Sequence, residues 1–216
     1  MNSYYCERID LNFWSEPLNA FTNLGFIIIS YIIFKNYKNQ KYIKAYAFII
    51  FLIGTSSFLF HTIPNKFTGF LDVISILIFI ILFTFDIYKN LTSQTLSIII
   101  TFTSIASYTI FGNIFKYSIL GSSAFYFLIV IHLYLIFLIL TLLKLKNRSY
   151  ILIAALLFTM SIFFRIMDQK VCHFLQHGTH FIWHILNSIT LLYCIKALIS
   201  LRKLVKTTSP KIPSKP

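Results

Sequence analysis

The 216-residue chain is 57% hydrophobic and only 12% charged, and 18% of its residues are aromatic. This composition excludes an ordinary soluble domain of the same length and indicates an integral membrane protein. The formal net charge is +13. Because the basic residues are scattered over short connections, with no soluble domain to gather them into a groove-sized patch, nucleic-acid binding is not expected.

Charged residues bracket seven apolar stretches, each near the ~20 residues that cross a bilayer as a helix. The predicted spans are 17–34, 45–65, 67–85, 90–115, 117–143, 149–164 and 171–195. Runs such as ILIFIILF do not alternate, which argues against a transmembrane β-barrel. The sequence therefore predicts an all-α, seven-transmembrane-helix bundle that forms one domain over 1–201, followed by a disordered basic tail over 202–216.

The distribution of Lys and Arg predicts the orientation of these spans. Fourteen of the nineteen lie in the connections after spans one, three and five or after span seven. By the positive-inside rule the amino terminus is outside and the carboxyl terminus cytoplasmic. The basic side can contact anionic lipid headgroups. No signal peptide is visible in the polar first sixteen residues, so the first span is expected to direct insertion.

The last predicted span carries a polar face at helical spacing. Its members are His177, His180, His184, Asn187 and Ser188. His180 and His184 are four residues apart, so two imidazoles can reach one metal ion from one helix. Histidines that pack or hydrogen-bond between helices would give the same pattern.

Two further polar groups lie near the start or end of other spans. Gly54, Ser57 and His61 share a face of the second span, either as a small-residue packing seam or as part of a site. Asp72 follows in the first turns of the third span, where a carboxylate is also favourable because it is near a helix amino terminus.

A fourth polar group, Glu16, Asn19 and Asn23, opens the first span, although Asn19 and Asn23 can also serve as interhelix hydrogen-bonding residues. With the spans threaded in alternating directions, all four groups fall at the same outer depth. A helix rises ~1.5 Å per residue, so offsets of one turn still allow a single site.

Three neutral histidines with an open fourth position are the ligand set of a catalytic zinc, which activates water and polarises a carbonyl. Asp72 can then accept the water proton, and Ser57 can donate a hydrogen bond to the developing oxyanion. The pattern indicates metal-assisted hydrolysis of an acyl bond in a substrate that arrives through the lipid.

Together these residues resemble the alkaline ceramidase family of the CREST superfamily. The matching motifs are SSFLFH, with an aspartate eleven residues beyond its histidine, and HFIWH on the last span. The stretches YCER and WSEPLNAFTNLGF resemble the amino-terminal signature of bacterial members. The resemblance covers residues 6–193.

The resemblance implies a seven-helix intramembrane zinc amidase. Its zinc ligands would be His61, His180 and His184, with Ser57 and Asp72 as the catalytic serine and aspartate. The family substrate is ceramide, which is cleaved at its amide to a fatty acid and a sphingoid base; another N-acyl lipid would suit the same chemistry. A bacterial-type member would lie in the inner membrane with its active site toward the periplasm.

The resemblance has three further implications. Cys6 and Cys172, both on the outer side, are expected to form a disulfide. Eukaryotic members have an acidic calcium site that this chain matches only at Glu7 and Glu16, so calcium, which takes six to eight oxygens, would find at most a weak site here. Zinc is therefore the expected cofactor.

Two more polar residues are expected near the metal ligands. Asp168 either pairs with Arg165 or Lys170 or orients a zinc histidine through the ring nitrogen that does not bind metal. Asn19 is likewise expected to support a metal ligand without binding the metal itself.

Two other classes of function compete with the hydrolase. Related CREST members that resemble the progestin and adipoQ receptors share the metal site, which leaves open a non-catalytic lipid receptor with a structural zinc. A metal transporter would need polar residues through both membrane halves. Here they cluster in one half, so transport ranks last.

Overall fold

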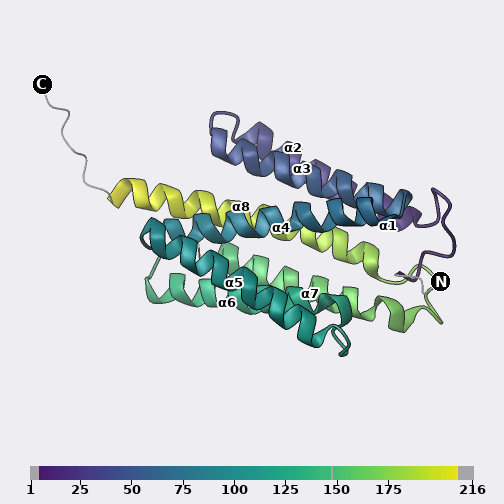
Figure 1. Cartoon of the computed structure of the whole chain (residues 1–216). Helices are drawn as coiled ribbons and strands as arrows, with labels where there is room; N and C mark the ends of the chain where they lie inside the picture. The colour runs from purple at the N-terminus through teal and green to yellow at the C-terminus, as the bar shows by residue number, and fades with distance from the viewer. Residues whose placement is uncertain (1–4, 147, 209–216) are drawn as a thin grey trace, which may run out of the picture.

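A computed structural model describes residues 5–146 and 148–208, and in this part of the chain every regular element is helical (Figure 1). The helices are α1 (Pro17–Thr22), α2 (Leu24–Asn36), α3 (Lys41–Thr62), α4 (Lys66–Lys89), α5 (Gln94–Phe115), the short 3₁₀ turn η1 (Gly121–Ser123), α6 (Ala124–Leu142), α7 (Ser149–Val171) and α8 (His180–Thr208). Seven helical segments within these described ranges are long and apolar enough to cross a membrane. The chain is a multi-pass integral membrane protein, and the predicted all-α class is confirmed.

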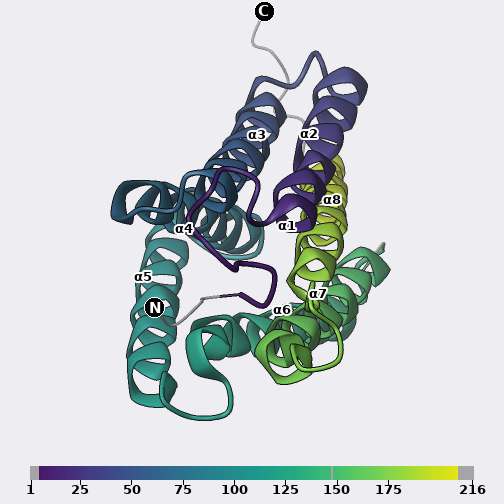
Figure 2. The same ribbon diagram turned by 90° about the vertical axis from the view of Figure 1, so that its right-hand side faces the viewer.

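The long helices form a closed ring around a shared interior (Figure 2). Each packs on its neighbour in chain order from α2 to α8, and α8 returns to pack on α2. α8 also contacts α3 and α4, so its inward face borders the middle of the bundle. Side chains from spans far apart in sequence can therefore meet along α8.

The first span is two helices rather than one. Pro17 occupies the first turn of α1, where its missing N–H costs nothing. Asn23 separates α1 from α2, and its side-chain amide donates to the carbonyl of Asn19 at 2.8 Å. Such a side-chain bond competes with the helical backbone pattern and favours a break.

The last two predicted spans differ from the structure at their boundaries. α7 continues past the predicted end at 164 to Val171, and α8 begins at His180 instead of 171. The sequence interpretation took charged residues as span ends, but Arg165 and Asp168 are accommodated within α7. Gly178, at φ +62°, makes the turn before α8, and a side chain there would collide with Asp168 and Cys6.

Helix α8 also runs beyond the predicted domain boundary at 201. Arg202 donates to Asp86 at 2.9 Å, and its guanidinium lies 3.5 Å from the centre of the Tyr42 ring. These contacts fix the helix where disorder was expected. The rest of the predicted tail, 209–216, lies outside the described residues, and the single-domain assignment stays a prediction.

The amino-terminal segment crosses one end of the ring before entering α1 (Figure 2). It is fastened there by the predicted disulfide between Cys6 and Cys172, whose Cα atoms are 5.3 Å apart. The bridge joins the segment to the connection between α7 and α8. Further contacts hold the segment against the ends of α3 and α8: Arg8 donates to the carbonyl of Phe60 at 3.2 Å, and the Tyr5 ring stacks on His180.

A thiol titration of the denatured, unreduced protein should find one free cysteine. Cys194 is the buried free thiol of α8, and the other two sulfurs are bonded to each other. Three reactive thiols per chain would contradict the bridge. The same titration after reduction provides the control and should find all three.

Candidate active site

Three buried histidines meet at the end of the bundle that the amino-terminal segment covers. His61 lies in the last turn of α3, and His180 and His184 lie on successive turns of α8. Each offers one ring nitrogen, and these atoms all lie within 4.8 Å of one another. The three side chains are at most 2% exposed. The four-residue spacing and the convergence of two helices thus produce one cluster able to hold a metal ion.

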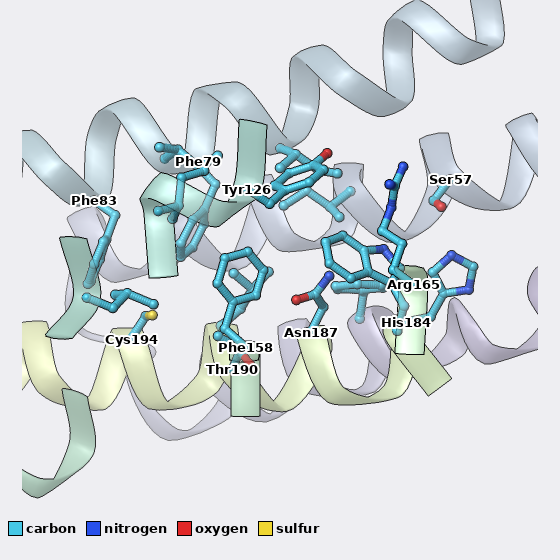
Figure 3. A pocket seen from close by; sticks show the side chains of 18 of the residues that line it. Ser57, Phe79, Phe83, Tyr126, Phe158, Arg165, His184, Asn187, Thr190 and Cys194 are labelled. Carbon is cyan, nitrogen blue, oxygen red and sulfur yellow. The ribbon is translucent and has the colours of Figure 1, made fainter. Parts of the chain in front are cut away.

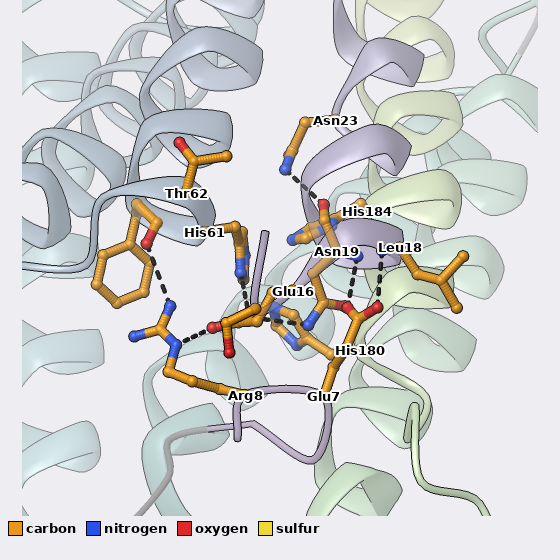
Figure 4. Close-up of polar contacts among 12 residues, drawn as sticks. Glu7, Arg8, Glu16, Leu18, Asn19, Asn23, His61, Thr62, His180 and His184 are labelled. Atoms are coloured by element: carbon orange, nitrogen blue, oxygen red, sulfur yellow. Dashed lines mark hydrogen bonds and ion pairs between the residues drawn. The ribbon is translucent and has the colours of Figure 1, made fainter. Parts of the chain in front are cut away.

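Glu16 fixes the ring of His61 (Figure 4). His61 Nδ1 lies 2.6 Å from Glu16 Oε2. An ionised carboxylate only accepts, so Nδ1 carries the proton and Nε2 keeps a lone pair for a metal. Glu16 also accepts from Arg8, and from Asn19 at 2.9 Å. Burial alone would raise the pKa of Glu16, but the hydrogen bond from His61 and the positive charge of Arg8 outweigh it and lower that pKa.

Thr22 holds His184 in the same way. Its hydroxyl is 3.0 Å from His184 Nδ1 and 2.7 Å from the carbonyl of Leu18. Because the single hydroxyl proton is donated to that carbonyl, the oxygen is left to accept from Nδ1–H. His184 Nε2 is then available as a ligand.

His180 is positioned through its backbone. Its N–H donates to Asp168 Oδ1 at 2.9 Å, beside the Thr179 N–H at 2.7 Å, so a carboxylate from α7 caps the start of α8. The Tyr5 ring stacks on the imidazole at 3.9 Å between centroids. His180 Nδ1 is buried without a hydrogen-bond partner among the described residues. A buried, unsatisfied ring nitrogen beside two oriented imidazoles fits a metal site.

A cavity adjoins the cluster and runs along the inner face of α8 (Figure 3). Ser57 and His184 line one end, Phe83 and Cys194 line the other, and Asp72 is also among the lining residues. Ser57 is 4% exposed and interacts with the Asp72 carboxyl, whose Oδ1 is buried without a partner among the described residues. A polar end beside the histidines thus continues into a mostly apolar cavity.

A cap at Asn65 fixes the position of Asp72 in α4. The Asn65 side chain accepts from the N–H groups of Phe67 and Thr68, and the Asn65 N–H in turn donates to the Thr68 hydroxyl oxygen at 3.1 Å. This reciprocal cap starts α4 two turns before Asp72. Asp72 therefore faces the cavity and does not lie at the helix end. The sequence alone did not decide between these two positions.

Comparison with known families decides the identity. The family model described as Ceramidase matches residues 4–213, nearly the whole chain. The chain belongs to the ceramidase family. It is therefore an amidase, a hydrolase of carbon–nitrogen bonds, as the resemblance implied. No curated protein and no solved structure gives a significant match.

In this member of the ceramidase family the carboxylates of the suggested calcium site accept hydrogen bonds from nearby donors. Both Glu7 oxygens accept backbone N–H bonds from the first turn of α1, from Leu18 at 2.7 Å and Asn19 at 2.8 Å. Burial raises the pKa of Glu7, and those two N–H groups oppose the rise. Glu16 faces Arg8 and His61. A weak calcium site at Glu7 and Glu16 stays a prediction.

The supporting residues differ in part from those expected. Asn19 donates to Glu16, which in turn contacts His61, so Asn19 lies close to its predicted position behind a metal ligand. Asp168 bonds the main chain at His180 instead of a ring nitrogen or a neighbouring cation. His177, on the predicted polar face of the last span, is exposed in the connection before α8 and lies outside the cluster.

Sequence reasoning missed four residues of this candidate site. They are Tyr5, Arg8, Thr22 and Arg165. Thr22 is three residues after Asn19, so helical spacing could have placed it on the same face. A charge within an apolar stretch was also a usable signal for Arg165. Tyr5 and Arg8 precede the first helix, where no periodic pattern assigns a direction.

Proposed function

We propose that this ceramidase-family chain is a zinc-dependent intramembrane amidase that hydrolyses the N-acyl bond of ceramide or a related N-acyl lipid. The products are a fatty acid and an amine. The observation that carries the proposal is the buried cluster of His61, His180 and His184 at the polar end of a mostly apolar cavity.

Zinc suits the donor set because three neutral imidazoles are the common protein ligands of a catalytic zinc. Bound there, zinc would supply a Lewis acid and lower the pKa of water toward neutrality. The hydrogen bonds from His61 to Glu16 and from His184 to Thr22 keep the rings oriented for this ligation.

Asp72 and Ser57 are the proposed catalytic residues. Asp72 has a buried carboxyl oxygen free to take a proton from the attacking water as its oxygen bonds to the acyl carbon. Ser57 donates a hydrogen bond to the amide oxygen as negative charge develops there. Asp72 then passes the proton to the amine nitrogen as the C–N bond breaks.

The apolar part of the cavity is the proposed acyl site. Phe79, Phe83 and Leu191 line it beyond the polar end. An acyl chain in this channel places its carbonyl next to Ser57 and the histidines. The surrounding helices and the amino-terminal segment limit access of bulk water to the reacting atoms.

The proposed membrane orientation follows from the basic residues. Fourteen of the nineteen Lys and Arg fall on the side opposite the histidine cluster, which places the amino terminus and active site outside. The amino-terminal signature supports a bacterial-type member in the inner membrane, with the site toward the periplasm. The basic side would contact anionic headgroups at the cytoplasmic surface.

Metal removal tests the proposal. Purified wild-type protein is expected to contain about one zinc per chain and to release fatty acid from ceramide or another N-acyl lipid. A zinc chelator should abolish release, and added zinc should restore it, while calcium alone should not. Full turnover in protein shown by elemental analysis to be zinc-free would contradict the proposed chemistry.

A further inference from the structure

Arg165 is a cation inside a membrane span whose charge acts on Asp72, although no hydrogen bond or ion pair joins it to Asp72 or to the histidine cluster among the described residues. It lies on α7, six residues before the helix ends, and lines the cavity with Ser57, Asp72 and His184 (Figure 3). Charged residues are costly at such positions and by default mark a functional site with a partner of opposite charge.

Neutral groups hold the guanidinium in place. Its Nη1 donates to the hydroxyls of Ser122 at 2.8 Å and Ser123 at 2.9 Å. The rings of Tyr126 and Trp183 lie 5.4 and 5.2 Å from its carbon, within cation–π range. These contacts orient the guanidinium without cancelling its charge.

No carboxylate within 4.0 Å neutralises Arg165 in the described part of the chain, where the salt bridges involve Arg8, His61 and Arg202. Asp168, three residues away, directs both oxygens to backbone N–H groups. Arg165 Nε is buried and has no hydrogen-bond partner among the described residues. The oriented cation therefore retains donor capacity for a ligand.

The cavity restricts where an anionic ligand group can lie. Arg165 is at the end with Ser57 and His184, whereas Phe83 and Cys194 lie at the opposite, apolar end (Figure 3). An acyl chain directed toward Phe83 puts the scissile amide near Ser57. The group that reaches Arg165 must then belong to the amine portion of the substrate.

We propose that Arg165 recognises an anionic group, a carboxylate or a phosphate, on the amine portion of an N-acyl lipid. The guanidinium fork matches either group with paired hydrogen bonds. This inference rests on the proposed amidase function and specifies its substrate class: anionic N-acyl lipids are preferred over neutral ceramide.

The test compares substrates that share one acyl chain. Wild-type protein is assayed with N-lauroylglycine, with the phosphate ester of N-lauroylethanolamine, and with neutral N-lauroylethanolamine and N-lauroyl ceramide. We expect kcat/KM for at least one anionic substrate to exceed that for N-lauroylethanolamine about 10- to 100-fold, the range expected for charge-assisted hydrogen bonds. The two anionic substrates distinguish carboxylate from phosphate recognition.

Variants assign the preference to Arg165. Arg165→Gln should lower kcat/KM for the preferred anionic substrate about 10- to 100-fold more than for neutral N-lauroylethanolamine, and Arg165→Lys should keep part of the preference. The matched control Lys170→Gln, at an exposed position on the same helix, should keep all of it. Equal rates on charged and neutral substrates in the wild type would overturn the proposal, and so would an equal loss on both in Arg165→Gln.

A binding experiment separates this inference from the amidase proposal. Ketomethylene analogues, in which CH₂ replaces the amide N–H, cannot be hydrolysed. The carboxylate analogue of N-lauroylglycine should bind about tenfold or more tightly than its hydroxymethyl counterpart, and Arg165→Gln should abolish the difference. If no substrate is cleaved but this difference is found, the amidase proposal fails and anion recognition stands; equal binding overturns the anion site itself.

Discussion

His184→Ala protein is expected to purify with little zinc and to lose amidase turnover by more than about a thousandfold, since metal Lewis acidity supplies several kcal/mol of transition-state stabilisation. Two imidazoles would remain, from His61 and His180, too few for a closed protein ligand set. Zinc content by elemental analysis and fatty acid release from the same preparation provide the measurement.

A matched control removes an imidazole without touching the cluster. His173 is exposed in the connection between α7 and α8. His173→Ala should therefore retain both zinc and turnover. If His184→Ala hydrolysed substrate at the wild-type rate, the histidine cluster would be excluded from the chemistry, whatever its metal content.

The existence of the helices and of the histidine cluster could be predicted from the sequence because both depend on local spacing. Apolar length identifies a span, and the separations from Ser57 to His61 and from His180 to His184 place side chains on shared faces. Alternating span directions then bring those faces to one membrane depth. This reasoning needs only the chain order.

The residues that orient the cluster could not be predicted as reliably because their partners are set by tertiary packing. Thr22 reaches His184 only because α1 packs against α8. Asp168 reaches the start of α8 because the connection before it turns back at Gly178. The predicted sixth span was also too short because charged residues were taken as its end. Hydropathy alone cannot distinguish a charged residue that faces the cavity from one that ends a helix.

The amino-terminal segment shows how these long-range contacts combine. One short stretch supplies the disulfide to Cys172, the ring that stacks on His180, the cap on α1 and the cation beside Glu16. Together these contacts tie α1, α7 and α8 to the same end of the bundle. The geometry of the cluster thus depends on a segment that has no regular structure. The segment is held in place by its disulfide and its polar contacts, and not by packing as a helix against other helices.

Asp72→Asn is expected to separate catalysis from metal binding. Asparagine matches the shape of aspartate but is a far weaker proton acceptor, so turnover should fall about 10²- to 10⁴-fold, the usual contribution of a general acid or base. Asp72 lies outside the three-histidine cluster, and His61 is held by Glu16, so zinc content should match the wild type.

The other aspartate of α4 provides the control for this variant. Asp86 lies near the opposite end of the helix and bonds Tyr46 and Arg202. Asp86→Asn should lower stability modestly while keeping turnover within a few-fold of wild type, because it touches neither the cluster nor the cavity. Wild-type turnover in Asp72→Asn would remove Asp72 from proton transfer. Loss of zinc together with turnover would instead make the aspartate a support of the metal site, and the proton would then need another acceptor at the reactive end of the cavity.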